Sequence, residues 1–319
     1  MLSPSGSDGN PGTASQPRRT LPALKSGDTV YFRGGTYPRF QLDWTNITGV
    51  RIQNYPGESP ILDGEYRTGD FANFRAGVSG IVISGLTVTR YADAYGNGSI
   101  NIVDNASNIT IEGNVFNANG LDTNLDHHIY LGGGSASGRP SNIVIRNNFF
   151  LNPAAASIHS FGGNNAVNVT IENNRLVGGK WGILISNEGE TNWRIANNSF
   201  SGITDTAILV ADYVKSSQAT VSGISIVRNI ISVPSGAFAL RIDKPQVRAR
   251  SVSEDGNLFW AGGGPVILWD YPGVGTSLSL AAYQAASGMG KTSVSFDPNF
   301  TDSSLRLPAS SPVGSWGAR

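Results

Sequence analysis

The chain has 319 residues, a formal net charge of zero from 23 basic and 23 acidic residues, 40 glycines and no cysteine. Only 14% of its residues are charged, but 39% are hydrophobic and lie in regular short runs, which excludes a disordered chain. The lack of a basic cluster argues against a nucleic-acid partner. The lack of cysteine excludes disulfides and thiolate metal sites. No apolar run approaches the ~18 residues of a membrane span.

The first 37 residues are expected to form a polar leader and an N-terminal cap. They begin MLSPSGSDGN, without the basic and apolar regions of a signal peptide, and we interpret Met1 as a start codon placed before a mature domain. Residues 19–25 (RTLPALK) favour a helical turn that Pro22 shortens, and TVYF at 29–32 predicts a strand.

From residue 49 the chain repeats one pattern, a run headed by Gly or Asn in which apolar and polar residues alternate. The runs start 24 to 34 residues apart, and they occupy 49–57, 80–88, 108–116, 142–150, 168–176, 192–200 and 223–231. Second, shorter runs lie between them, at 99–103, 128–132, 157–161, 182–186, 207–211 and 239–243. A period of this length, varying in its loops and not in its strands, predicts a solenoid.

Each repeat provides three short strands, because the long run bends and continues as a third strand. Parallel strands cannot be joined by hairpins, and the repeats contain no helix of crossover length. We therefore predict an all-β fold in one domain over residues 1–319, a single-stranded parallel β-helix. One side of each strand fills its interior and the other side faces water.

Asparagines mark the bend in each repeat. They stand at 147/148, 173/174 and 197/198, with single counterparts at Asn114 and Asn229. Stacked asparagines can pass amide hydrogen bonds from coil to coil, and Asn tolerates the left-handed backbone of a tight bend. We therefore interpret the N-x-[ST] residues Asn108, Asn168 and Asn197 as members of an asparagine ladder and not as glycosylation sites.

Both ends of the chain resemble the right-handed parallel β-helix superfamily typified by pectate lyases. The resembling segments are the leader SGSDGNPGTASQP, the following SGDTVYFRGGTY, and the closing segments at 279–288, 295–300 and 306–314. The resemblance covers nearly the whole chain and implies a right-handed solenoid, a C-terminal cap over 277–319 with a short helix at 279–288, and a secreted or cell-surface protein. It implies the fold more strongly than a reaction, because the superfamily includes lyases, hydrolases, epimerases and non-catalytic modules. The tandem Asp cluster of the calcium-dependent pectate lyases is absent.

Equivalent positions of successive coils stack ~4.8 Å apart in such a fold. If the inward residues of the short runs are Ile100, Ile129, Ile158, Ile183, Ile208 and Leu240, the outward column that follows them is Asn101, Tyr130, His159, Leu184, Leu209 and Arg241. Tyr130 and His159 are then direct neighbours. His128 and Asp126 lie on the coil of Tyr130, Lys180 lies one coil beyond His159, and the small residues around Gly162 and Gly163 leave a hollow.

This group predicts a general acid/base site. Histidine titrates near neutrality, and a tyrosine beside it can donate a proton or, if activated, accept one. In a uronate lyase a base removes the proton next to the carboxylate, and a cation or hydrogen-bond donors stabilise the enolate-like charge. The candidate catalytic residues are Tyr130, His159, His128 and Lys180, and the candidate substrate-binding residues are Asn101, Asp126, Trp181, Asp205 and Arg241. In the resembling lyases, the substrate groove runs along the outer face of this same sheet.

Structural roles stay open for several of these residues. His128 could cap a turn, Lys180 could be a solvent-exposed loop lysine, and Trp181 could plug a loop. His127 is expected to face a loop.

Two other functions compete with the lyase. A glycoside hydrolase needs two carboxylates about 5–9.5 Å apart, but Asp126 and Asp205 are three coils, roughly 14 Å, apart. The remaining pairs, Asp122 with Asp126 and Glu188 with Glu190, lie in loops. A non-catalytic polysaccharide-binding or surface module would use aromatic platforms at Tyr91, Tyr95, Trp181, Trp193 and Tyr213.

The expected partner is a polysaccharide, with neither nucleic acid nor membrane, and we expect a monomer. No metal ligands are assigned. Asp and Glu side chains near the groove could hold Ca²⁺, but no ligand-spaced cluster in the sequence identifies them.

Overall fold

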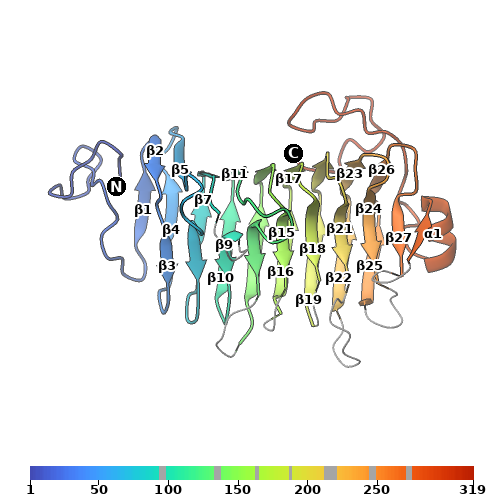
Figure 1. Ribbon diagram of the computed structural model, residues 1–319, viewed down its shortest axis with the longest axis horizontal. Helices are drawn as coiled ribbons and strands as arrows, with labels where there is room; N and C mark the ends of the chain where they lie inside the picture. The colour runs from blue at the N-terminus through green and yellow to red at the C-terminus, as the bar shows by residue number, and fades with distance from the viewer. Residues whose placement is uncertain are drawn as a thin grey trace.

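The computed structural model describes residues 1–92, 98–132, 138–161, 165–186, 189–211, 221–243, 249–270 and 275–319. This part of the chain forms an elongated solenoid, with the N-terminal segment at one end and the helix α1 (Leu280–Ser287) at the other (Figure 1). Three sheets run along the solenoid, and successive coils add strands to each. Within the described ranges, no helix is long and apolar enough to cross a membrane.

Sheet A is formed by the first part of each long run. Its described strands, in spatial order, are β1 (Thr29–Phe32), β4 (Arg51–Asn54), β7 (Val82–Ser84), β10 (Ser107–Glu112), β13 (Ser141–Arg146), β16 (Val167–Glu172), β19 (Thr191–Ala196), β22 (Val221–Val227) and β25 (Ala249–Asp255).

Sheet B continues each coil after the bend. Its described strands are β2 (Gly35–Pro38), β5 (Pro60–Asp63), β8 (Thr87–Thr89), β11 (Val115–Asn117), β14 (Phe149–Leu151), β17 (Arg175–Val177), β20 (Ser199–Ser201), β23 (Ile230–Val233) and β26 (Leu258–Ala261).

Sheet C collects the shorter runs and carries the site described below. Its described strands are β3 (Leu42–Trp44), β6 (Ala72–Phe74), β9 (Gly98–Ile102), β12 (His127–Leu131), β15 (Ala156–Ser160), β18 (Trp181–Ile185), β21 (Thr206–Val210), β24 (Phe238–Ile242), β27 (Ile267–Trp269) and β28 (Thr276–Leu278). Neighbouring strands are parallel, except that β28 pairs antiparallel with β27.

The predicted fold class is confirmed, and so is the predicted register of sheet C. Each of its six predicted strands begins one residue earlier than expected, for example β12 at His127. Ile129 pairs with Ile100 and Ile158, and this inward column is buried in the core. In the outward column Tyr130 pairs with Asn101 on one side and with His159 on the other.

Two rows of asparagines run along the solenoid. The inner row is buried and consists of Asn114, Asn148, Asn174, Asn198, Asn229 and Asn257. From Asn148 onward, each Oδ1 accepts hydrogen bonds of 2.8–3.1 Å from the backbone and the side-chain amide of the asparagine one coil before. The Oδ1 of Asn114, the first of the row, accepts from the Leu86 amide at 3.0 Å. The outer row, Asn108, Asn142, Asn168 and Asn192, has left-handed backbone with φ of 54–59°. Its side chains bond one another at 3.1–3.2 Å, so the amides of Asn108 and Asn168 are engaged with neighbouring coils.

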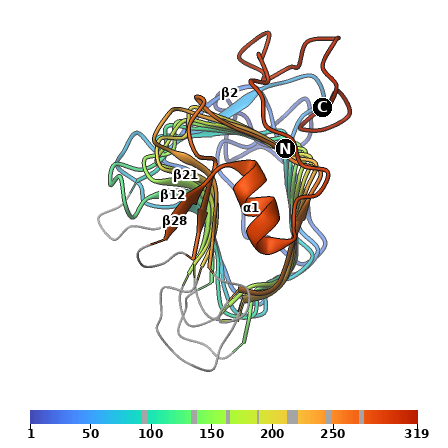
Figure 2. The same cartoon turned by 90° about the vertical axis from the view of Figure 1, so that its right-hand side faces the viewer.

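The C-terminal end of the solenoid is covered by α1, as predicted from 279–288 (Figure 2). The Ser279 side chain caps its first turn, and Gly288 ends it in the left-handed conformation that glycine adopts without strain. Tyr283 is fully buried, and its ring packs edge-on against Trp269 of β27 with centroids 5.5 Å apart.

The N-terminal end differs from expectation in two ways. The first coil begins at Thr29, inside the predicted cap, because β1 and β2 already belong to sheets A and B. Residues 19–25 form no helix. Leu21 and Leu24 instead pack against the core from a segment without regular secondary structure. Pro22 disfavours a helix there because it has no amide hydrogen to donate.

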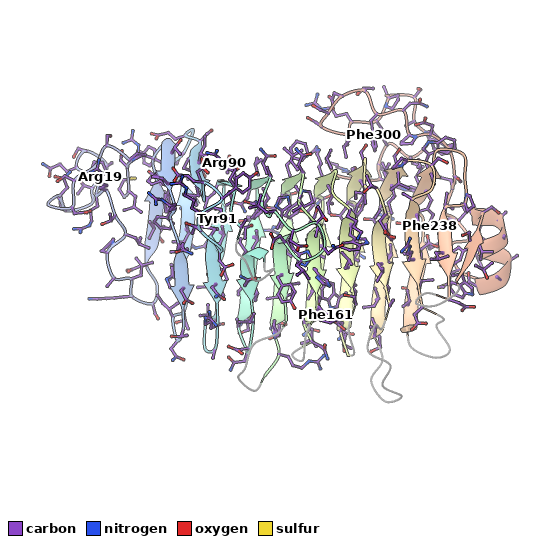
Figure 3. All side chains as sticks on the ribbon, in the orientation of Figure 1. Arg19, Arg90, Tyr91, Phe161, Phe238 and Phe300 are labelled. Carbon is purple, nitrogen blue, oxygen red and sulfur yellow. The ribbon has the colours of Figure 1, made fainter. Side chains whose placement is uncertain are left out.

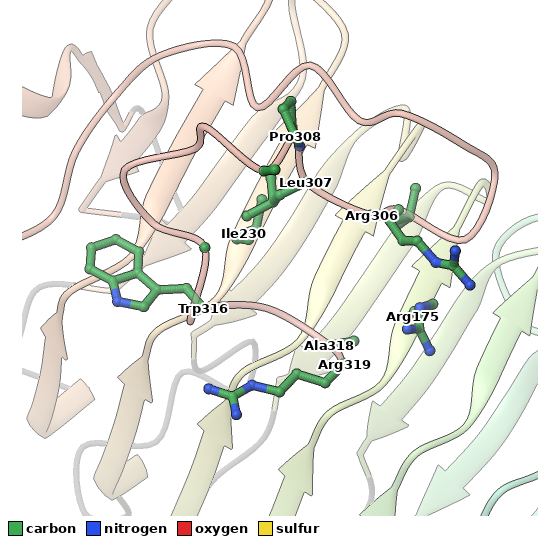
Figure 4. A pocket seen from close by; sticks show the side chains of 11 residues that line it. Arg175, Ile230, Arg306, Leu307, Pro308, Trp316, Ala318 and Arg319 are labelled. Carbon is green, nitrogen blue, oxygen red and sulfur yellow. The ribbon is translucent and has the colours of Figure 1, made fainter.

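After α1 the chain turns back over sheet B, where it encloses a hollow of about 450 Å³ (Figure 4). Arg175 of β17 donates to the carbonyl of Ser304 at 2.6 Å, and the amide of Gly317 donates to the carbonyl of Arg228 at 2.9 Å. Trp316 packs in an apolar cluster with Ile230 and other residues. The tail is therefore held along sheet B, away from sheet C.

Candidate functional site

A pocket of about 460 Å³ lies on the outer face of sheet C. Strands β12, β15 and β18 supply most of its lining, and the loop before β12 contributes Asn124 and Leu125. Leu125 and Phe161 are exposed apolar side chains at this pocket. The lining is therefore largely aromatic and aliphatic, with a small number of polar groups, as is typical of ligand sites.

Tyr130 and His159 lie side by side in this pocket, as the register predicts. Their ring centroids are 5.6 Å apart and the rings meet edge to face. The Tyr130 hydroxyl donates to the carbonyl of Phe161 at 2.8 Å. Burial raises the pKa of Tyr130 to about 12, with a smaller contribution from Glu190, and burial lowers the pKa of His159 to about 4. At neutral pH the pair is therefore a neutral imidazole beside a protonated phenol.

His127 was expected to face a loop, and that expectation is wrong. It is the first residue of β12, it is 3% exposed, and its ring stacks on Tyr130 with centroids 6.0 Å apart. Its Nε2 lies 2.8 Å from His159 Nδ1, while no hydrogen-bond partner for its Nδ1 is found among the described residues. Burial, and secondarily His159 and His128, lower the pKa of His127 well below its usual value.

His128 does not join the candidate catalytic group, and it caps no turn. Its ring is fully buried inside the solenoid, beside the stacked rings of Phe116 and Phe150. Nδ1 lies 3.0 Å from the Asn119 amide and Nε2 lies 3.0 Å from the Leu151 carbonyl. Burial lowers its pKa to about 3.

The reversal of these two histidines has a geometric cause. Residues 127 and 129 pair with the next coil, but the ladder skips residue 128. Every neighbouring strand from β9 to β24 skips the equivalent position. At the bend into sheet C, two consecutive residues therefore point inward, and strict alternation assigns the wrong histidine to the outer face.

Ser186 was missed by the sequence analysis. It directly follows β18, lines the pocket, and places its Oγ 2.7 Å from His159 Nε2. The same hydroxyl is 3.3 Å from the Ser160 carbonyl. Alternation from the inward Ile183 would have placed Ser186 on the outer face, so the sequence did contain a signal.

Lys180 and Trp181 form one side of the site. The Lys180 ammonium donates to Asn124 Oδ1 at 2.6 Å and lies 4.1 Å from the Trp181 ring centroid. Trp181 lines the pocket and packs against Ala156 and Leu184. Lys180 therefore links the loop at Asn124 to the aromatic wall.

Asn101 and Asp126 have backbone partners. The Asn101 side chain accepts from the Gly98 amide at 2.9 Å and donates to the Gly98 carbonyl at 3.2 Å. Asp126 Oδ2 accepts from the amides of Leu121 and Asp122 at 2.7 and 2.9 Å. Asp126 thereby shapes the loop that flanks the pocket.

Asp205 and Arg241 lie apart from the pocket lining. Their side chains form an ion pair of 3.1 Å, and the Arg241 guanidinium lies 5.0 Å from the Phe238 ring centroid. Figure 3 shows Phe238 closer to the C-terminal end of the solenoid than Phe161, which lies at its middle. The structure therefore does not bring these two residues together with His159.

The described carboxylates considered for a hydrolase or a metal site lie outside the pocket lining. Among the described residues that line the pocket, none is a carboxylate. Asp122 Oδ1 accepts from the amides of Asn124 and Leu125, and Glu190 is buried and accepts from Ser160. Within the described ranges there is no group of three or more His, Cys, Asp or Glu side chains placed to hold a metal ion.

Two of the expected aromatic platforms are wrong, because Tyr91 and Trp193 are almost fully buried. Tyr91 donates to the Phe40 carbonyl, and the Trp193 indole donates to the Ala166 carbonyl. The other predicted residues Tyr95, Gly162, Gly163, Glu188 and Tyr213 lie outside the described residues.

No protein-family model and no curated protein sequence matches the chain. Among solved structures it is similar to the GH136 lacto-N-biosidase from Eubacterium ramulus, with a TM-score of 0.65 and 12% identity over 83% of this chain. The match covers 56% of that protein, so the chain spans just over half of its length. A rhamnogalacturonan lyase matches with a TM-score of 0.58 and 13% identity, covering 100% of this chain and 94% of the lyase.

The surface adhesin PfbA of Streptococcus pneumoniae matches with a TM-score of 0.52 and 14% identity, covering 75% of this chain and 71% of the adhesin. At these identities the likeness concerns the fold and not the reaction. The chain has the right-handed parallel β-helix fold that the GH136 lacto-N-biosidase and the rhamnogalacturonan lyase share.

Proposed function

We propose that this carbohydrate-active β-helix is a polysaccharide lyase that cleaves a uronate-containing polysaccharide by β-elimination at the pocket on sheet C. The observation that carries the proposal is the edge-to-face pairing of His159 with Tyr130 on adjacent strands. Burial lowers the pKa of His159 to about 4 and raises the pKa of Tyr130 to about 12, which favours a neutral imidazole beside a protonated phenol. These are the protonation states that a base and an acid need at the start of an elimination.

In this mechanism His159 Nε2 takes the proton next to the substrate carboxyl group. The Ser186 hydroxyl, which can turn to the Ser160 carbonyl 3.3 Å away, frees that nitrogen. The electron pair of the broken C–H bond forms the new double bond as the glycosidic C–O bond breaks. Tyr130 then gives its proton to the leaving oxygen.

Substrate binding is assigned to the wall beside this pair. A sugar ring can stack on Trp181, which lines the pocket. The Lys180 ammonium next to it can offset the negative charge that develops on the carboxyl group. Asn101, the register neighbour of Tyr130, is a further donor on the preceding coil.

We further propose that the protein works as a monomer outside the cell or on its surface. The similar structures include a rhamnogalacturonan lyase and a surface adhesin, and this likeness supports a polysaccharide as the partner.

The proposal is tested by incubating the chain with a panel of uronate polysaccharides and following the ultraviolet absorbance of the unsaturated product. We expect turnover that His159→Ala and Tyr130→Phe each reduce by about 100-fold or more. Ser225→Ala, on the outer side of sheet A, serves as the control and should retain full activity.

Two results would contradict the lyase. Release of reducing ends without the unsaturated product would indicate a hydrolase. Glycan binding without turnover on the whole panel would indicate a binding module. The same assay with added Ca²⁺ and with a chelator tests the calcium dependence that the sequence leaves open.

A further inference from the structure

Three side chains from three successive coils form one hydrogen-bonded line in the pocket. Ser186 Oγ lies 2.7 Å from His159 Nε2, and His159 Nδ1 lies 2.8 Å from His127 Nε2. Both ring nitrogens of His159 are therefore engaged, one with a hydroxyl and one with a second imidazole. A general base needs no such serine to perform an elimination, so the lyase mechanism does not explain why Ser186 and His127 bond to His159.

The protonation of this line follows from its geometry. If the Ser186 hydroxyl donates to His159 Nε2, then His159 must carry its proton on Nδ1 and donate it to His127 Nε2. His127 is then protonated on Nδ1, the nitrogen with no partner among the described residues. This order is that of a nucleophile, a base and an orienting group.

We propose that Ser186 is an acyl-accepting nucleophile, activated by His159 and oriented through His127, and that the pocket hydrolyses acyl esters carried by a glycan. This activity is separate from the β-elimination proposed above and does not depend on it. It uses no cofactor and no reactant other than water.

The proposed hydrolysis takes place in two steps, acylation of Ser186 and hydrolysis of the acyl-serine. Ser186 Oγ bonds to the acyl carbon while its proton passes to His159 Nε2, and the ester C–O bond then breaks as His159 returns the proton to the sugar oxygen. Water, deprotonated by His159, attacks the acyl-serine, releases the carboxylic acid and restores the serine.

The walls around Ser186 suit a short acyl chain. Leu184, Trp181 and Phe161 line the pocket with it, and Leu184 is the direct register neighbour of His159. Apolar side chains bind a short hydrocarbon chain because they remove its surface from water. Because His127 replaces the carboxylate of a serine triad, the imidazolium formed during attack is less stabilised, and we expect hydrolysis to be fastest with activated esters.

The test uses the full chain and a fluorophosphonate probe, with the labelled residue located by peptide mass spectrometry. We expect one probe per chain, attached to Ser186. Labelling should vanish in Ser186→Ala, fall about 100-fold in His159→Ala, and stay unchanged in Ser225→Ala. Release of nitrophenol from nitrophenyl acetate should follow the same order. This readout is independent of the unsaturated product, so failure of either proposal can be recognised separately.

A second variant guards against misfolding of the alanine variants. The chain has no cysteine, so Ser186→Cys and Ser225→Cys each introduce a single thiol. A histidine partner promotes the thiolate, so Ser186→Cys should be alkylated faster at pH 6 than Ser225→Cys, and adding His159→Ala should abolish the difference. Absence of label on Ser186 in the folded chain, or label and alkylation that persist without His159, would overturn the proposal.

Discussion

Replacing Glu254 by Gln is expected to stabilise the protein at alkaline pH and to leave it unchanged in acid. Glu254 lies in β25 near the C-terminal cover and is 3% exposed. Its Oε1 accepts from the Asn257 amide at 2.7 Å and from the Ser293 hydroxyl. Burial raises the pKa of this carboxyl group from 4.5 to about 7, against the opposing effect of the two hydrogen bonds.

The magnitude follows from linkage. Between pH 4.5 and about 7, the folded chain holds a proton that the unfolded chain has lost, so unfolding releases a proton and the free energy of unfolding falls as pH rises. A pKa difference of one corresponds to ~1.36 kcal/mol, so the full effect is about 3 kcal/mol and is complete above pH 7. Gln keeps an oxygen for both donors and carries no charge at any pH.

Urea denaturation of both proteins at pH 5 and pH 8 measures this effect, because titration of all other groups cancels in the difference. The advantage of Glu254→Gln should grow by about 2 to 3 kcal/mol between the two pH values. Ser293→Ala removes a hydrogen bond but keeps the titrating group, so its stability should still fall as pH rises. An equal difference between Glu254→Gln and the parent at both pH values would refute the reasoning.

Three further predictions concern the rows and the pocket. Asn174→Ala should lower the free energy of unfolding by about 3 kcal/mol, because it leaves buried amides of the inner row unpaired. Asn142→Gly in the outer row should lower it by less than about 1 kcal/mol. Thermal unfolding of the two variants measures this difference. The lyase rate should rise as the pH increases through about 4, because His159 loses its proton, and it should fall toward pH 12, because Tyr130 ionises. If the residual activity of His159→Ala still rose through pH 4, this assignment would be contradicted. Trp181→Ala should raise KM about 10-fold with little change in kcat, and an unchanged KM would remove it from the binding site.

The fold could be predicted because it rests on local periodicity. The inward isoleucines recur with a period of two within a strand and at nearly constant spacing between coils, so the register of Tyr130 against His159 followed from counting residues. The inner and outer rows could be told apart only in the structure. Both are made of asparagines at bends, and burial separates them. Asn148 donates to the Ile111 carbonyl in the interior, whereas the Asn142 side chain bonds to Asn108 and Asn168 of the outer row.

The site was predicted less completely, for physical reasons that differ from residue to residue. The sequence pattern predicts His128 in the catalytic group, but the structure places His127 there and His128 in the interior. The bend into sheet C turns two consecutive residues inward, and a period of two cannot represent this. Asp126 was taken for a substrate ligand, but its carboxylate is occupied by loop amides. Partners of this kind depend on loop conformation, and the sequence pattern does not determine it.

The position of the chemistry on sheet C follows from the repeat itself. Every coil must keep its inward residues and its inner asparagine, so only outward residues can differ from one coil to the next without cost to the core. Three adjacent coils differ in this way and supply His127, His159 and Ser186, whose side chains meet diagonally across three neighbouring strands spaced ~4.8 Å apart. The stacking of coils therefore fixes the spacing of the three strands, and the side chains bridge the offset along them. The inner row bonds the same coils to one another through Asn148 and Asn174, so the structure that fixes the fold also fixes the geometry of the site.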